Sequence, residues 1–307
     1  MMKLCLGIGE LMVEMAPSQT PDLWQRGYAG DVFNSLYYAR MMMPDDWKVA
    51  FHTGLGTDQL SDDIIDFIAS HNIACDNIPR IENRTAGLYM IQLHDGERYF
   101  SYWRNDSAAR LMMRDPEQLA DKLSSARHIY LSGISLAILT AEERTVLLDM
   151  IRSAKTPDKT VFFDSNIRPK LWASANEMRN SITDAGRVAD IVLPSLEDEQ
   201  ATFGDAEDTD VAARYLALGA QAVIVKNGAA SVLLATTSGQ RYFPACPVGK
   251  MIDSTAAGDA FNGAFMARLA AGDNMEDAIQ AAHKCAAIVV THIGALAPKD
   301  LFTNMGS

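Results

Sequence analysis

From about residue 126 onward, short apolar segments alternate regularly with segments of helical periodicity. The apolar segments are His128–Leu131, Thr160–Asp164, Ile191–Pro194, Ala222–Lys226 and Ser231–Ala235. Parallel strands need long crossover connections, so this alternation is typical of a mainly parallel sheet with helices on both faces. We therefore expect residues 1–307 to form one α/β domain, with its active site at the carboxyl ends of the strands.

The N-terminal third predicts a second, smaller sheet. Ala86–Leu93 and Arg98–Trp103 resemble two strands of a hairpin, and Asp95-Gly96 is the strongest part of its turn signal. Together with extended segments near residues 10–30, this hairpin predicts a lid formed by about residues 10–30 and 86–104. An exposed face of such a sheet favours self-association, so we expect a homo-oligomer formed through the lid.

Composition excludes several classes of protein. Apolar residues make up 48% and charged residues 21%, as in ordinary globular proteins. The net charge of −12 disfavours nucleic acid and anionic membranes as partners. The chain has no apolar run long enough to span a membrane and no signal-peptide pattern. Its scattered cysteines favour free thiols of a reducing cytoplasm, namely Cys5, Cys75, Cys246 and Cys285.

The segment Asp253–Phe261 carries the sharpest chemical signal. Small residues surround the expected start of a helix over about 256–271, where free N–H groups and the helix dipole favour an anion. Asp259 stands where a hydroxyl nucleophile would lose its proton. The same composition also suits an ordinary helix cap, so spacing alone leaves both interpretations open.

This segment resembles the C-terminal signature D-T-x-G-A-G-D of the ribokinase-like (PfkB) sugar kinases. Ser254 replaces the threonine, and Ala256 replaces the first glycine. The resemblance implies a ribokinase-like α/β fold and transfer of the γ-phosphoryl group of ATP to a sugar. It also implies that the backbone of Ala256, Ala257 and Gly258 forms the anion hole and that Asp259 is the general base.

Resemblance extends to the sugar-binding motif. The segment 27–34 looks like the family's first motif, in which glycine and asparagine contact sugar hydroxyls. It implies substrate contacts from Gly30, Asp31 and Asn34. Glycine lets the backbone approach the sugar, and an asparagine amide both donates and accepts hydrogen bonds.

Four segments resemble a subgroup of the family, the kinases of 2-keto-3-deoxygluconate, which act at the 6-hydroxyl. They are Ala86–Tyr89, Ser101–Ala109, Tyr130–Leu136 and Asp164–Trp172. The last of them also resembles bacterial fructokinases, so a neutral ketose stays an alternative substrate.

A sugar acid needs cationic groups for its carboxylate, and arginine offers a planar bidentate fork. Arg104 and Arg168 are the expected carboxylate ligands, and Tyr89 and Tyr102 could stack on or hydrogen-bond the sugar. An arginine at a strand end is more often a surface charge, and Arg168 could instead neutralise the transferring phosphate. Arg104 beside Tyr102 favours the sugar acid over fructose.

The nucleotide is expected at a tight turn that follows an apolar strand. The segment Lys226–Ser231 resembles the family's K-x-G-x-x-G loop, with Ser231 in place of the last glycine. The resemblance implies that Lys226, Gly228, Ser231, Gly258 and Ser195 bind ATP. It also implies that the segment 281–291, which contains a histidine, flanks the adenine.

Mg²⁺ is expected because ATP chemistry needs charge neutralisation. The family's N-x-x-E motif matches Ser195 to Asp198 in shortened form, so Asp198 is the expected metal ligand, with Glu197 or Glu199 as substitutes. A K⁺ ion near Asp253 is implied by family analogy.

Two other classes of protein deserve comparison. Gly7-Ile8-Gly9 after a first strand might indicate a dinucleotide-binding oxidoreductase, but the third glycine of G-x-G-x-x-G is missing at Met12. A sugar-binding regulatory protein on the same fold stays open, because a fold does not determine a function. The presence of Asp259 favours an enzyme.

Overall fold

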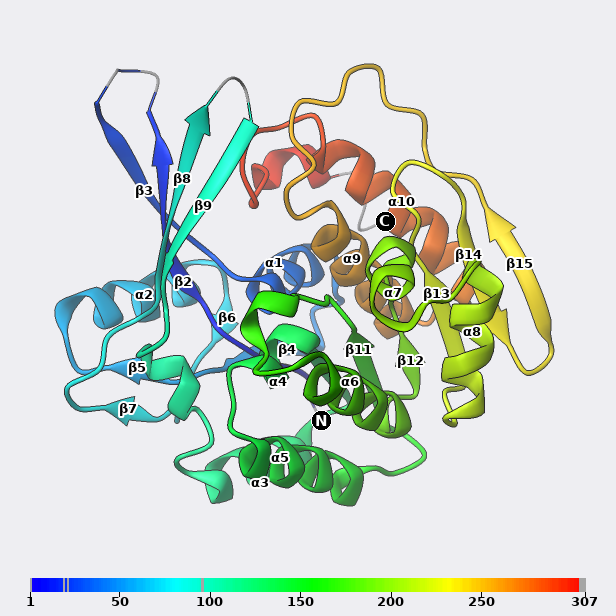
Figure 1. The fold of residues 1–307 in the computed structure, drawn as a ribbon, viewed down its shortest axis with the longest axis horizontal. Coiled ribbons are helices and arrows are strands. Elements are labelled where there is room, and N and C mark those ends of the chain that lie inside the picture. Colours follow the sequence, from blue (N-terminus) through cyan, green and yellow to red (C-terminus); the bar gives the residue numbers. More distant parts are fainter. Residues whose placement is uncertain (1, 19, 21, 95–96, 304–307) are drawn as a thin grey trace.

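A computed structural model describes residues 2–303 except 19, 21 and 95–96. Its centre is a nine-stranded sheet (Figure 1). In spatial order its strands are β15 (Gly239–Phe243), β14 (Val232–Thr236), β13 (Ala222–Val225), β12 (Ile191–Val192), β11 (Thr160–Asp164), β10 (His128–Ser132), β1 (Lys3–Ile8), β4 (Trp47–His52) and β6 (Ile73–Ala74). Neighbouring strands from β6 to β13 are parallel, whereas β14 and β15 are antiparallel.

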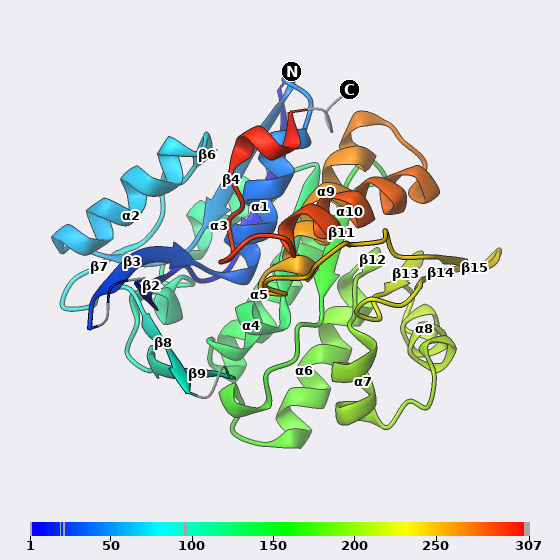
Figure 2. The ribbon, with the colours of Figure 1, turned by 90° about the horizontal axis from the view of Figure 1, so that it is seen from above.

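Helices cover both faces of this sheet (Figure 2). One layer contains α1 (Asp31–Met42), α2 (Gln59–Ser70), α9 (Ala257–Ala271) and α10 (Met275–Val289). The other contains α3 (Pro116–Ser125), α4 (Gly133–Ala137), α5 (Ala141–Ala154), α6 (Ala175–Val188), α7 (Leu196–Phe203) and α8 (Asp208–Ala217). Side chains alternate between the two layers: Tyr130 and Phe162 pack into the first, and Ile129 and Phe163 into the second. The predicted α/β fold with helices on both faces is therefore confirmed.

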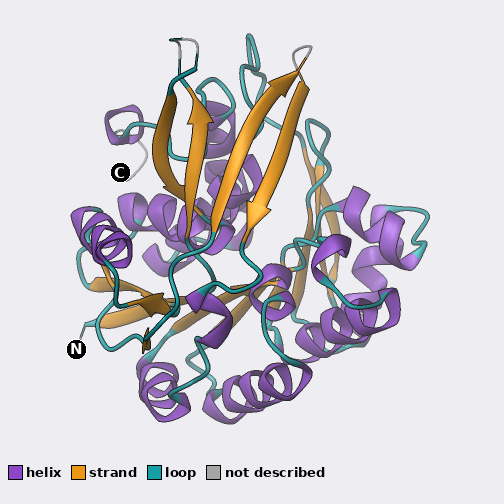
Figure 3. Cartoon of the chain, turned by 60° about the vertical axis from the view of Figure 1, so that its left-hand side comes forward, coloured by secondary structure: helices purple, strands orange, loops and turns teal. Residues whose placement is uncertain are grey.

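A separate four-stranded sheet rises beside the main body (Figure 3). Its order is β3 (Trp24–Ala29), β2 (Met12–Pro17), β8 (Leu88–His94) and β9 (Glu97–Trp103). The sequence predicts the β8–β9 hairpin, while its expected Asp95-Gly96 turn lies outside the described residues. We call this four-stranded sheet the lid. A two-residue pair, β5 (Leu55–Gly56) and β7 (Arg80–Ile81), forms a third small sheet.

Local signals explain where the elements begin and end. Helix α2 begins at Gln59, because the Asp58 carboxylate accepts the backbone N–H of Ser61 at 3.0 Å. Helix α10 begins after Asn274, whose side-chain oxygen accepts the backbone N–H of Asp277, and it ends at Val289. Short 3-10 helices complete the chain at Ala108–Leu111, Pro169–Leu171 and Lys299–Phe302. Among the described residues, no helix is both long and apolar enough to cross a bilayer.

Candidate active site

The site lies where helix α9 begins, above the carboxyl ends of the central strands. Ala256, just before the helix, has left-handed backbone angles of φ 59° and ψ 14°. This conformation suits glycine, and an alanine adopts it at a cost because its Cβ approaches the neighbouring carbonyl. The sharp turn brings the backbone into the helix so that Asp259 occupies its first turn.

The Asp259 carboxylate is held by helix α1. Asn34, a buried residue of that helix, donates its side-chain N–H to Asp259 Oδ2 at 2.8 Å. Removal from water and the nearby Asp31 charge raise the pKa of Asp259 to about 7, with a further contribution from Asp164, while Asn34 and Lys226 act in the opposite direction. A carboxylate with a pKa near neutrality is suited to proton transfer at physiological pH.

A lysine and two carboxylates complete the centre of the site. Lys226 Nζ donates to Asp164 Oδ2 at 3.1 Å and to Asn262 Oδ1 at 3.2 Å. A Cβ built on Gly258 would lie 3.7 Å from that amine, so the Lys226 amine lies directly beside the first turn of α9. Asp31, whose pKa burial raises, accepts a hydrogen bond from Asn166 Nδ2 at 2.6 Å.

Asn262 was missed by the sequence analysis. Its Nδ2 donates to Asp164 Oδ2 at 2.7 Å and to the Tyr130 hydroxyl at 3.1 Å. The signal that could have found it is helical spacing, because residue 262 stands one turn after Asp259 on the same helix. Its importance depends on the neighbouring strand β11, which supplies Asp164.

The predicted sugar-contact residues come together at the start of α1. Gly30 precedes the helix with extended backbone angles, and a Cβ there would overlap the carbonyl oxygen of Glu10. Gly30 N–H also faces Asn34 Oδ1 at 3.4 Å. The structure thus places Gly30, Asp31 and Asn34 next to Asp259.

The lid contributes aromatic residues on the face that packs toward Ala295 and Ala256. Tyr89 is buried there and donates its hydroxyl hydrogen to Glu14. Tyr102 lies opposite Tyr89 in the β8–β9 register with ring centroids 5.8 Å apart, and 53% of its surface is exposed. Tyr102 therefore has surface available for a ligand, whereas Tyr89 already has a hydrogen-bond partner.

The two predicted arginines each pair with a carboxylate of this chain. Arg104 is buried, with 7% exposure, and forms an ion pair with Glu10. Arg168 is half exposed and donates to Asp198 Oδ2 at 3.3 Å. The sequence predicts both side chains as ligands of an external carboxylate, but it does not reveal these internal partners.

The predicted nucleotide loop has the expected turn geometry. Gly228 has a φ of 52°, a conformation that favours glycine. Ser195 forms an isolated bridge with Lys226 and precedes α7, so the two predicted nucleotide neighbours lie side by side. Ser231 immediately precedes β14 and is half-buried.

The acidic residues near Ser195 differ in what they could bind. Burial raises the pKa of Asp198, and Arg168 opposes that shift. Glu199 is fully buried and accepts hydrogen bonds from Arg214 at 2.7 Å and from Tyr215 at 2.9 Å, so it is not the substitute metal ligand that the sequence suggested. Within the described part of the chain, no group of three or more His, Cys, Asp or Glu side chains is arranged to hold a metal.

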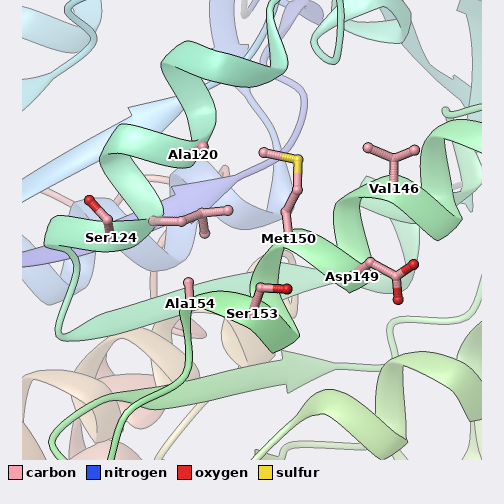
Figure 4. Close-up of a pocket in the computed structure, with 8 residues that line it drawn as sticks. Ala120, Ser124, Val146, Asp149, Met150, Ser153 and Ala154 are labelled. Carbon is pink, nitrogen blue, oxygen red and sulfur yellow. The ribbon is translucent and has the colours of Figure 1, made fainter.

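Asp253 stabilises the turn that precedes α9. Its Oδ1 accepts the Thr255 N–H at 2.9 Å, and its Oδ2 accepts the Gly294 N–H at 2.8 Å. The carboxylate thereby joins the turn before α9 to the segment that follows α10. A separate shallow groove between α3 and α5 is lined by Leu123, Val146 and Met150 among others, and none of the predicted site residues lines it (Figure 4).

Comparison with known proteins identifies the family of this chain. The model of the pfkB family of carbohydrate kinases matches residues 4–300, and the chain belongs to that family. It is 38% identical to the 2-dehydro-3-deoxygluconokinase of Escherichia coli K12 over 300 residues, which cover 95% of this chain and 96% of that protein.

Solved structures show the same likeness. A PfkB protein from Polaromonas sp. JS666 superimposes with a TM-score of 0.83 and 26% identity, covering 99% of this chain and 100% of that one. A fructokinase with bound ATP from Xylella fastidiosa superimposes with a TM-score of 0.81 and 25% identity, covering 96% and 94%. The predicted family and its ribokinase-like fold are confirmed, and the chain is a carbohydrate kinase.

Proposed function

We propose that this kinase phosphorylates 2-keto-3-deoxygluconate at its 6-hydroxyl with ATP, and that residues 1–307 act as one domain. The observation that carries the proposal is the Asp259 carboxylate, held by Asn34 in the first turn of α9 with a pKa of about 7. The 38% identity to an enzyme named 2-dehydro-3-deoxygluconokinase supports the choice of substrate.

The reaction assigns one role to each part of the site. Asp259 takes the proton of the sugar 6-hydroxyl while the oxygen of that hydroxyl forms a bond to the γ-phosphorus. The bond from the γ-phosphorus to the β,γ-bridging oxygen breaks at the same time, which releases ADP. Backbone N–H groups of residues 256–259 stabilise the charge on the phosphoryl oxygens. Lys226, already beside Gly258, adds a positive charge, and Gly228 and Ser231 border the nucleotide.

Residues of the lid and residues at the N-terminus of α1 bind the sugar acid. Gly30, Asp31 and Asn34 bind sugar hydroxyls, while Tyr102 covers the sugar. Arg104 binds the carboxylate: a guanidinium has five N–H donors, and the Glu10 contact uses one on Nη2. Arg168, paired with Asp198 near Asp164, is placed for either the sugar acid or the transferring phosphate.

Mg²⁺ fits this donor set: Asp198 would hold the ion together with phosphates and water. Mg²⁺ keeps several waters and needs only one or two carboxylates, which a single side chain such as Asp198 can supply. Bound there, it would neutralise phosphate charge. We also assign a K⁺ ion to the loop around Asp253.

The proposal has two further parts, which concern the surroundings of the enzyme. Trp103 and Tyr99, on the outer lid face, are 59% and 51% exposed, which supports a homo-oligomer formed through the lid. Free cysteines and the use of ATP support a cytoplasmic location.

A steady-state panel of sugars and sugar acids with ATP tests the substrate. We expect ADP formation with 2-keto-3-deoxygluconate at a kcat/KM well above that with fructose. The likeness to fructokinase with bound ATP makes fructose the specific alternative, and a preference for fructose would support it. Sugar binding without ADP formation would instead identify a regulatory sugar-binding protein.

The substitution Arg104→Ala tests the carboxylate ligand. We expect the KM for 2-keto-3-deoxygluconate to rise about 10- to 100-fold, the value of one charge-assisted hydrogen bond, and the KM for fructose to change much less. Equal effects on both sugars would remove Arg104 from that role.

A further inference from the structure

Glu10 occupies the junction between the lid and the main body. The chain passes between the two parts at four points: before β2, after β3, before β8 and after β9. Glu10 itself lies at the first crossing, and its side chain is 1% exposed. Its carboxylate pairs with Arg104, which follows β9, and accepts the Ser107 hydroxyl hydrogen at 2.6 Å.

The two remaining crossings also pack on Glu10. Gly30 follows β3, and a Cβ on it would overlap the Glu10 carbonyl oxygen. Gly87 precedes β8, and a Cβ on it would lie 2.9 Å from Glu10 Oε1. One buried residue therefore lies at one crossing and packs against the chain at the other three, and two glycines leave room for it.

Arg104 lies on the lid face that carries the tyrosines. In the β8–β9 register Tyr102 lies opposite Tyr89, so strand alternation places residue 104 on the lid face that carries these tyrosines. A Cβ on Gly87 would lie 3.2 Å from the Arg104 Cβ, which confirms that residues 87 and 104 are cross-strand neighbours. A planar guanidinium with one edge fixed presents its other N–H groups in a defined direction.

We propose that Glu10 is a positioning residue that orients Arg104 for the carboxylate of the sugar acid and couples this recognition to the placement of the lid. The recognition half of this inference rests on the proposed function, whereas the lid half does not. A buried arginine without a carboxylate partner would turn toward water or toward other acceptors.

The substitution E10Q tests both halves, since it keeps the size of the side chain and removes its charge. We expect the KM for 2-keto-3-deoxygluconate to rise about 10- to 100-fold, as for loss of one charge-assisted hydrogen bond, with the KM for ATP unchanged. Relative to the wild type, E10Q should also speed backbone hydrogen exchange in the lid strands β2, β8 and β9 more than in the central strands. Should E10Q be insoluble, E10D, which keeps the charge on a shorter arm, is expected to show the same changes to a smaller degree.

Arg144 and Glu177 provide a matched control. Arg144 is also buried and also forms an ion pair, with Glu177 on helix α6. The variant E177Q should leave the KM for the sugar acid and the lid exchange as in the wild type. An equal rise of the KM in E177Q, or an equal rise for the sugar acid and ATP in E10Q, overturns the proposal.

A double-mutant cycle separates positioning from direct contact. If Glu10 acts through Arg104, E10Q should add nothing to the KM of the variant R104M, and E10Q/R104M should equal R104M. Additive effects contradict the proposal. If the wild type does not use the sugar acid at all, the proposed function fails, and lid exchange in E10Q against E177Q still decides whether Glu10 holds the lid.

Discussion

Two polar centres of this molecule, one partly buried and one fully buried, differ in their charge balance. Around Asp259, three carboxylates (Asp31, Asp164 and Asp259) lie near one lysine, Lys226, which donates to Asp164. At the lid junction, Glu10 and Arg104 form a one-to-one pair. Burial, together with the surplus of negative charge at the first centre, raises the pKa of its base, whereas the balanced pair holds two segments together. Unequal charge thus suits proton transfer, and equal charge suits positioning.

The largest expected effect would break the first centre. Asp259→Asn should lower kcat by about 10²- to 10⁴-fold, the usual contribution of a general base, while ATP binding stays nearly intact. Steady-state kinetics and a direct ATP-binding titration measure the two quantities. A kcat within a few-fold of the wild type would show that another group accepts the proton.

The same substitution should make folding stability less dependent on pH. Because the folded-state pKa of Asp259, about 7, exceeds the ordinary aspartate value of 3.8, the folded protein retains a proton that the unfolded chain has released. Wild-type stability from this group is therefore lost as pH rises from about 4 to 7. The free energy of unfolding of Asp259→Asn should therefore rise relative to that of the wild type over this pH range. The difference should reach up to about 4 kcal/mol above pH 7, and less where water reaches the carboxylate.

Urea unfolding at pH 5 and pH 8 measures this difference. The gain of Asp259→Asn over the wild type should be larger at pH 8. A gain that is the same at both values would mean that Asp259 titrates as an ordinary carboxylate.

The pH–rate profile sharpens the comparison by testing the charge surplus itself. Wild-type kcat/KM should fall below a pH of about 7, since the base must be deprotonated to accept a proton. Asp31→Asn removes a charge that raises the pKa of Asp259, so its acidic limb should move to lower pH even if kcat also falls. An acidic limb that stays in place would assign it to another group.

The smallest expected effect concerns the backbone before α9. Ala256 has a φ of 59°, so Ala256→Gly should relieve a left-handed alanine and raise the free energy of unfolding by about 1 kcal/mol. Thermal or urea unfolding would detect the change, and Ala257→Gly, inside the helix, should be destabilising instead. Destabilisation by both glycines would show that the left-handed turn is not strained.

Much of the fold follows from local pattern. Strand β11 was predicted with its observed bounds, because a buried parallel strand is continuously apolar. Strand β15, with four exposed residues of five, has no such pattern and was not predicted. An edge strand forms because it pairs with a neighbouring strand, and a short stretch of its own sequence does not reveal that neighbour.

The site residues likewise fall into those that local motifs predicted and those that the sequence did not reveal. Asp259, Lys226 and Gly228 stand in motifs whose spacing is readable along the chain, and the structure places Lys226 beside Gly258. Asn262 and Glu10 were not predicted as site residues, because their partners Asp164 and Arg104 are 98 and 94 positions away in the chain.

The sequence by itself determined the fold class, the family and the position of the carboxylate at the start of α9, because helical and strand periodicities and short motifs are local properties. Only the tertiary structure decided which charges meet: Lys226 with Asp164, Arg168 with Asp198, and Arg104 with Glu10. Electrostatic energy depends on distance and burial rather than on separation along the chain, so the pKa of the base and the direction of the arginine emerge only when the segments pack.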